Sequence, residues 1–287
     1  MDKIISLTSG GVDSVLLTWG LARMSPELTF LPLYYQSKLS GAYWQREHGS
    51  NVNAWKMFRE LTPNVLEPQQ YGGLDIKVSR GRTEYRNQIY IDATLRLFGS
   101  DPDVVGVSLG VCPGQDTGNW IHTWSLNKED HSPDFLVAYL RARRPGWKLW
   151  TFKDFEGAIP EIGKKSERVK LGVQLLGEDW LWASTSCQRW YLGRKPGIYS
   201  YLGEGIPAVG GCGECHSCVA RFVAIVCALG YDKTPYRHDP PRARWLLQYA
   251  AEYKNVDLFI RGLPYMKDGR IVTRVLGEWM ERRLVSV

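Results

Sequence analysis

A glycine-containing turn near the start of the chain constrains its fold more than any other segment. The turn has the sequence Ser9-Gly10-Gly11-Val12-Asp13-Ser14. It follows an apolar run at 4–8 and precedes an apolar-periodic stretch at 15–24, an order that predicts strand, turn and helix. Glycines let the backbone turn tightly and approach a ligand, and amides at a helix start favour an anion. A binding turn and an ordinary βα turn are the two interpretations.

The rest of the chain alternates strand-like and helix-like segments. Apolar runs predict further strands at 28–35, 74–78 and 104–111, and helical spacing predicts helices at 49–61, 84–98, 133–141 and 164–176. This alternation predicts an α/β fold, a doubly wound parallel sheet with helices on both faces. In such sheets ligands bind beyond the carboxyl ends of the strands, which is where the first turn lies.

Four cysteines late in the chain have the spacing of metal ligands. Cys212, Cys215 and Cys218 form a C-x₂-C-x₂-C pattern, and Cys187 lies upstream. Four thiolates complete the tetrahedral coordination of zinc, so the ion would be structural. An iron–sulfur cluster is the competing interpretation, because the same spacing begins ferredoxin motifs, but no Cys-Pro closes the run here.

Charge and hydropathy limit the partners of the chain. The net charge of +6 suits an anionic ligand such as ATP, and no long run of like charge demands nucleic acid. No segment approaches the ~20 apolar residues of a membrane helix, and no secretory signal is visible. We therefore expect a cytoplasmic protein whose cysteines are reduced and free to bind metal.

Two distant features together resemble one enzyme family. The turn at 9–14 resembles the pyrophosphate loop (PP-loop) of the ATP pyrophosphatases, which cleave ATP between its α and β phosphates. With the distant cysteines, it makes residues 1–238 similar to the 7-cyano-7-deazaguanine synthases of queuosine biosynthesis, as a divergent member. Those enzymes activate the carboxylate of 7-carboxy-7-deazaguanine with ATP. Ammonia then gives an amide, and a dehydration gives the nitrile.

Intermediate motifs carry the same resemblance. The matching segments are Tyr43-Trp44-Gln45-Arg46, Arg86-Asn87, Gly106 to Gly110, Ser132-Pro133-Asp134-Phe135, Lys165-Ser166-Glu167, Thr185-Ser186-Cys187 and Cys218-Val219-Ala220-Arg221. The resemblance implies an adenine-nucleotide α-hydrolase-like, Rossmann-type fold that uses ATP, Mg²⁺ and a structural Zn²⁺. It implies a PP-loop domain over 1–180, a zinc-binding subdomain over 181–238 and a helical C-terminal extension over 239–287.

Adenylation of a carboxylate indicates which residues would act on the phosphates. The reaction brings two anions together and expels pyrophosphate, so the site needs amides, cations and Mg²⁺ aimed at the phosphates. Lys165 and Arg86 are the candidate cations, and Asp13 is the candidate Mg²⁺ ligand, directly or through water. No side-chain nucleophile is needed, because the substrate carboxylate attacks the α-phosphate. The alternative for either cation is a solvated surface charge.

The resemblance also indicates candidate contacts to the substrate base. Asp134 would accept hydrogen bonds from adjacent N–H donors of a guanine-like ring, and Gln45 and Arg46 are further substrate-binding candidates. The alternative for Asp134 is a favourable acid in the first turn of a helix.

Departures from the family pattern leave the acceptor amine open. Segments 36–42, 112–132 and 191–211 differ from it, and the C-terminal tail is extra. The first hypothesis is the synthase itself, with ammonia as acceptor. The second is transfer of the activated acid to another amine, for example on a partner protein in antiviral defence. The third is a PP-loop tRNA-modifying enzyme, and a non-enzymatic nucleotide-binding module is least favoured. A homodimer is the assembly that the resemblance implies.

Overall fold

The computed structural model describes residues 2–37, 43–74, 86–110, 133–155, 165–184, 186, 211, 213 and 216–236. These described residues fall into two compact units, of which the first ends at Ser184 and the second begins at Ser186. The first unit contains the sheet. The second contains helix α8 (His216–Leu229). Within the described ranges, no helix is long and apolar enough to cross a membrane.

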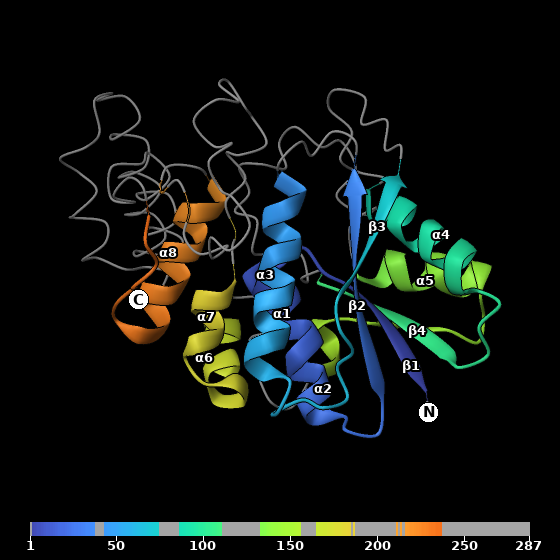
Figure 1. The fold of residues 1–287 in the computed structure, drawn as a ribbon, viewed down its shortest axis with the longest axis horizontal. Helices are drawn as coiled ribbons and strands as arrows, with labels where there is room; N and C mark the ends of the chain where they lie inside the picture. Colours follow the sequence, from blue (N-terminus) through green and yellow to red (C-terminus); the bar gives the residue numbers. More distant parts are fainter. Residues whose placement is uncertain are drawn as a thin grey trace, which may run out of the picture. The chain divides into compact units, whose positions relative to one another are not determined.

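A five-stranded, entirely parallel sheet forms the centre of the first unit (Figure 1). Its strands are β1 (Lys3–Leu7), β2 (Thr29–Ser37), β3 (Gln69–Leu74), β4 (Val104–Leu109) and β5 (Lys148–Trp150). Their spatial order is β3-β2-β1-β4-β5. The order reverses between β1 and β4, so the switch point where such folds bind ligands lies at the carboxyl ends of these two strands. The prediction of an α/β fold with a parallel sheet is confirmed, and the strand order is compatible with a Rossmann-like fold.

Helices cover both faces of the sheet (Figure 1). The helix after β1 has three consecutive stretches, α1 (Val12–Val15), the π-helical η1 (Leu16–Gly20) and α2 (Leu21–Met24). It shares one face with α3 (Tyr43–Phe58), α6 (Lys165–Leu176) and α7 (Asp179–Ala183). Helices α4 (Arg86–Phe98) and α5 (Pro133–Arg143) lie on the other face.

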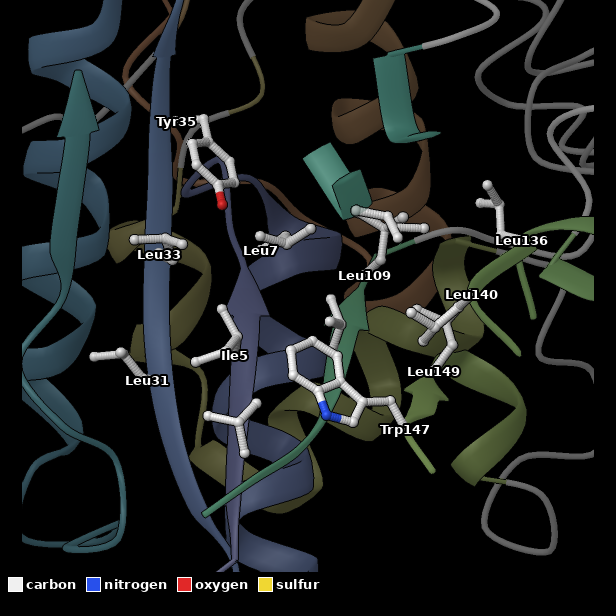
Figure 2. Packing of buried hydrophobic residues seen from close by; sticks show 13 residues of the cluster. Ile5, Leu7, Leu31, Leu33, Tyr35, Leu109, Leu136, Leu140, Trp147 and Leu149 are labelled. Carbon is white, nitrogen blue, oxygen red and sulfur yellow. The ribbon is translucent and has the colours of Figure 1, made fainter. Parts of the chain in front are cut away.

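Alternate side chains of the central strands build the core beneath α4 and α5 (Figure 2). The core includes Ile5 and Leu7 of β1, Leu31 and Leu33 of β2, Val107 and Leu109 of β4, Ile91 of α4, and Leu136 and Leu140 of α5. The intervening residues Ile4 and Phe30 are also fully buried. Because both faces are covered, these strands read as continuous apolar runs, which is why the sequence predicted them.

A buried polar contact joins the two strands at the switch point. The Ser108 hydroxyl donates to Oγ of Ser6 at 2.8 Å. These serines are 0–1% exposed, so each would otherwise lack a partner in the core. The contact therefore supports the register of β1 against β4.

The two edge strands differ from expectation. The strand predicted at 74–78 instead runs over Gln69–Leu74, and residues 75–78 lie outside the described part. Among the described strands, β3 pairs only with β2, and Gln70 donates from Nε2 to Oε1 of Gln36 at 2.9 Å. An edge strand needs no continuous apolar run, so its polar sequence escaped the hydrophobic pattern. Strand β5 was missed because it is only three residues long.

Helix boundaries shift by a few residues. The helix predicted at 49–61 runs over Tyr43–Phe58, because polar residues at its start carried no apolar periodicity. The helices predicted at 15–24, 84–98, 133–141 and 164–176 correspond to α1–η1–α2, α4, α5 and α6. Residues 84, 85 and 164 lie outside the described part.

Helices α6 and α7 pack closely because Gly172 presents no side chain to Trp180. A Cβ at position 172 would overlap Cζ2 and Cε2 of the Trp180 indole, which is fully buried. We expect Gly172→Ala to lower the free energy of unfolding by about 1–3 kcal/mol, even though alanine favours helix by about 1 kcal/mol. Urea denaturation measures this change. The control is Gly146→Ala, where a Cβ meets nothing within 4 Å; equal midpoints for the two variants would contradict the packing argument.

Candidate functional site

The turn at 9–14 lies at the carboxyl end of β1, against the end of β4. A Cβ on Gly110, the residue after β4, would lie 3.4 Å from the amide nitrogen of Ser14 and 3.5 Å from its Cα. These are ordinary van der Waals distances, so the backbones after the two strands are close neighbours. The turn therefore occupies the switch point of the sheet.

Helix α3 fixes the backbone of this turn. Gly10 has a φ of +69°, and a Cβ there would lie 2.6 Å from Cβ of Ser50 and 2.7 Å from the carbonyl oxygen of Glu47. The Ser50 hydroxyl donates to the Gly10 carbonyl at 2.8 Å. The Thr8 hydroxyl donates to Oδ1 of Asn51 at 2.7 Å, and Nδ2 of Asn51 donates back to the Thr8 carbonyl at 3.2 Å. Glycine at position 10 is therefore required by conformation and by space.

Ser14 closes the turn through its own hydroxyl. Its Oγ donates to the Gly11 carbonyl at 3.1 Å and accepts from the amide of Ser9 at 3.3 Å. The hydroxyls of Ser9 and Ser14 are also 3.4 Å apart. Val12 is fully buried, so its side chain packs in the core. The side chains of the turn thus shape its backbone.

Asp13 is held between two cations of α6. Nζ of Lys165 lies 2.9 Å from Oδ2, and Nε of Arg168 lies 3.0 Å from Oδ1. The side chains of Asp13, Lys165 and Arg168 are 26%, 15% and 1% exposed. The structure therefore brings together the two predicted site residues Asp13 and Lys165. Each carboxylate oxygen accepts from one cation and has a further lone pair, so Mg²⁺ binding by Asp13, directly or through water, stays a prediction.

The two cations keep the Asp13 carboxyl ionised. Burial alone raises its pKa, but the charges of Lys165 and Arg168 and their hydrogen bonds outweigh that effect, and the pKa lies well below its ordinary 3.8. A carboxylate with a lowered pKa stabilises the fold above that ordinary value and loses this contribution as the pH falls toward the folded pKa. The Asp13 carboxylate therefore keeps its charge throughout the neutral range.

Arg168 is a charged site residue that the sequence reasoning missed. It follows Lys165 by three positions, so both side chains leave the same face of α6. Its guanidinium carbon lies 5.1 Å from the ring centroid of Phe152, which begins η5 (Phe152–Phe155) just after β5. The three-residue separation of Arg168 from Lys165 was the signal in the sequence that could have indicated it. The polar residues Ser50 and Asn51 of α3 were also missed, and their pairing with the turn depends on tertiary packing.

Asp134 stands at the surface. It occupies the first turn of α5, its side chain is 79% exposed, and Nζ of Lys153 lies 2.6 Å from its Oδ1. An exposed pair of this kind contributes little to stability, so it leaves the carboxylate available to a ligand.

Other predicted site residues are described in part. Gln45 and Arg46 lie on α3 and Arg86 begins α4, but their side chains lie outside the described part. Cys187, Cys212 and Cys215 also lie outside it, whereas Cys218 is buried in α8. No group of three or more candidate metal ligands occurs among the described residues, and the zinc site stays a prediction.

In the second unit, the described segment that follows α8 folds back on this helix. Tyr236 forms a parallel bridge with Gly211, and its hydroxyl donates to Oδ2 of Asp232 at 2.9 Å. Burial raises the pKa of Tyr236 well above 10.0. Nε of the buried Arg221 donates to Oγ1 of Thr234 at 3.4 Å. These contacts connect the residue that precedes Cys212 with the segment after the helix that carries Cys218.

No protein-family model matches this sequence, and no curated protein matches it significantly. A functional interpretation therefore rests on the motifs of the chain and on the geometry of the Asp13 cluster.

Proposed function

We propose that this protein is an ATP-dependent carbon–nitrogen ligase. It would adenylate the carboxylate of 7-carboxy-7-deazaguanine and use ammonia to convert the acid to 7-cyano-7-deazaguanine. The observation that carries the proposal is the placement of Lys165 and Arg168 around Asp13, in the turn at the switch point. Cations beside the amides of a helix start are suited to binding phosphates.

In the proposed reaction, the substrate carboxylate attacks the α-phosphorus of ATP. The bond to the bridging oxygen breaks, and pyrophosphate leaves with the electron pair. The amides of the turn and the Lys165 ammonium would stabilise the negative charge that develops on this leaving group. Mg²⁺ would supply further positive charge when bound. Ammonia then attacks the adenylate carbonyl, AMP leaves, and dehydration of the amide gives the nitrile.

The remaining parts of the proposal follow from the motif resemblance. Asp134 would accept from the N–H edge of the base, and its exposure in α5 is compatible with this contact. Cys187, Cys212, Cys215 and Cys218 would hold a structural zinc ion. We also propose a cytoplasmic location and a homodimer.

One assay tests the reaction. The purified protein is incubated with ATP, Mg²⁺ and 7-carboxy-7-deazaguanine, with and without ammonia, and AMP and the base are followed by mass spectrometry. We expect AMP and the nitrile only when all components are present. The matched control is 7-deazaguanine, which has no carboxylate to activate and should give no AMP.

The same assay separates the alternatives. AMP or a persistent adenylate without nitrile would indicate that another amine, such as one on a partner protein, is the acceptor. AMP formation that depends on added tRNA and not on the deazaguanine acid would indicate a tRNA-modifying enzyme. No AMP in any arm would contradict the proposed activity.

A further inference from the structure

We infer that Arg168 is a positioning residue that makes the phosphate site more positive by sharing the Asp13 carboxylate with Lys165. The inference rests on the proposed function, because it assigns phosphates to this site. Each carboxylate oxygen lies about one hydrogen-bond length from a different cation, Oδ2 from Lys165 at 2.9 Å and Oδ1 from Arg168 at 3.0 Å. The Asp13 carboxylate therefore forms an ion pair with each of two positive charges.

Burial fixes Arg168 in this role. Its side chain is 1% exposed, so it is not placed to meet a ligand from solvent and acts through Asp13. The ring of Phe152 lies 5.1 Å from its guanidinium carbon on one side, and Asp13 accepts from Nε. The charge of Arg168 is permanent, because a guanidinium stays protonated inside proteins. The Asp13 carboxyl beside it stays ionised.

The shared carboxylate changes what Lys165 can offer. In a one-to-one pair, the carboxylate would offset the charge of the ammonium for any approaching anion. The second cation adds one positive charge to that pair and competes for the same carboxylate. Lys165, 15% exposed in the first turn of α6, is the cation of the two that is nearer to solvent. Arg168 thus strengthens anion binding without touching the anion.

A series of charge variants tests this inference, with Mg²⁺-free inorganic pyrophosphate as the probe and calorimetric titration as the measurement. Arg168→Met removes the buried charge and should weaken pyrophosphate binding by about tenfold, as expected for one unit charge a few ångströms away at a partly screened site. The double variant Asp13→Asn/Arg168→Met has the wild-type net charge and should bind within about threefold of wild type. Asp13→Asn alone keeps the Arg168 charge, so it should bind more tightly than the double variant and at least as tightly as wild type.

The control is Lys170→Met, which removes a positive charge from the same helix. Lys170 is 48% exposed and pairs with Glu167 at 3.0 Å, so pyrophosphate binding should change by less than about twofold. Circular dichroism and thermal unfolding monitor the fold of each variant. If Arg168→Met does not fold, the comparison of Asp13→Asn with the double variant decides, because these two differ only in the charge and shape of residue 168.

The inference is overturned if the double variant binds pyrophosphate as weakly as Arg168→Met, since Arg168 would then act only on structure. It is also overturned if Arg168→Met binds as wild type does, or if Asp13→Asn binds no more tightly than the double variant. Pyrophosphate binding needs no acid substrate. The charge variants could therefore bind pyrophosphate as expected while the wild-type protein forms no nitrile. That result would contradict the proposed substrate and still support the role of Arg168.

Discussion

Lys165→Gln is expected to lower the rate of substrate-dependent AMP formation by about 100-fold or more, because one fixed donor to a developing oxyanion contributes a factor of this size. Its stability should stay close to that of wild type, since Arg168 still pairs with Asp13 at 3.0 Å. The measurement is kcat/KM for ATP in the AMP assay, together with thermal unfolding of the same preparation.

Lys170→Gln is the matched control for this substitution. The same change is made about 1.4 turns further along α6, at a side chain that is 48% exposed. We expect its activity to be that of wild type. If both variants lose activity equally, the loss comes from damage to the helix. If Lys165→Gln keeps full activity, Lys165 does not act on the phosphates.

Gly10→Ala is expected to abolish ATP use and to lower the free energy of unfolding by about 2–4 kcal/mol, of which about 1–2 kcal/mol comes from the left-handed backbone. The φ of residue 10 is +69°, and the added methyl group would lie 2.6 Å from Cβ of Ser50 and 2.7 Å from the backbone oxygen of Glu47. The turn would have to move away from α3. Urea denaturation and AMP formation measure the two effects.

Gly177→Ala isolates the contribution of the backbone. Gly177 has a φ of +77°, and a Cβ there meets nothing within 4 Å. We expect a loss of only about 1–2 kcal/mol, with ATP use retained. The difference between the two variants then reports the contact between the turn and α3. Equal losses of stability in Gly10→Ala and Gly177→Ala would show that the contact between the turn and α3 accommodates the methyl group with no change in the free energy of unfolding.

The centre of the sheet was predictable from sequence, and its edges were not. Strands β1, β2 and β4 are buried on both faces and therefore carry mainly apolar residues, interrupted at the buried Ser6 and Ser108. Strand β3 lies at one edge, with Tyr71 45% exposed and glutamines at its first two positions, so hydrophobicity gave it no signal. Strand β5 has three residues, too few for a periodic pattern.

The residues of the candidate site also fall into those that the sequence predicted and those that it did not. The turn at 9–14 and Lys165 were recognisable from local motifs. Arg168, Phe152, Ser50 and Asn51 were not, because their roles depend on contacts between distant elements. The spacing of Arg168 from Lys165 predicts a shared helix face, but no local rule says that this face meets Asp13. Asp134 keeps its predicted place in a first helical turn, and its exposure agrees with either interpretation of that residue.

The distance along the sequence between Asp13 and its two cations has a consequence for biosynthesis. Arg168 lies 155 residues after Asp13 and Lys165 lies 152 residues after it. A ribosome adding about 5–20 residues per second needs many seconds to reach α6 after it has made the turn. During that interval the nascent turn has its amides and its carboxylate but neither of these cations. An incomplete chain therefore lacks the Asp13 cluster, and the nucleotide binding that we propose would have to wait until α6 is made.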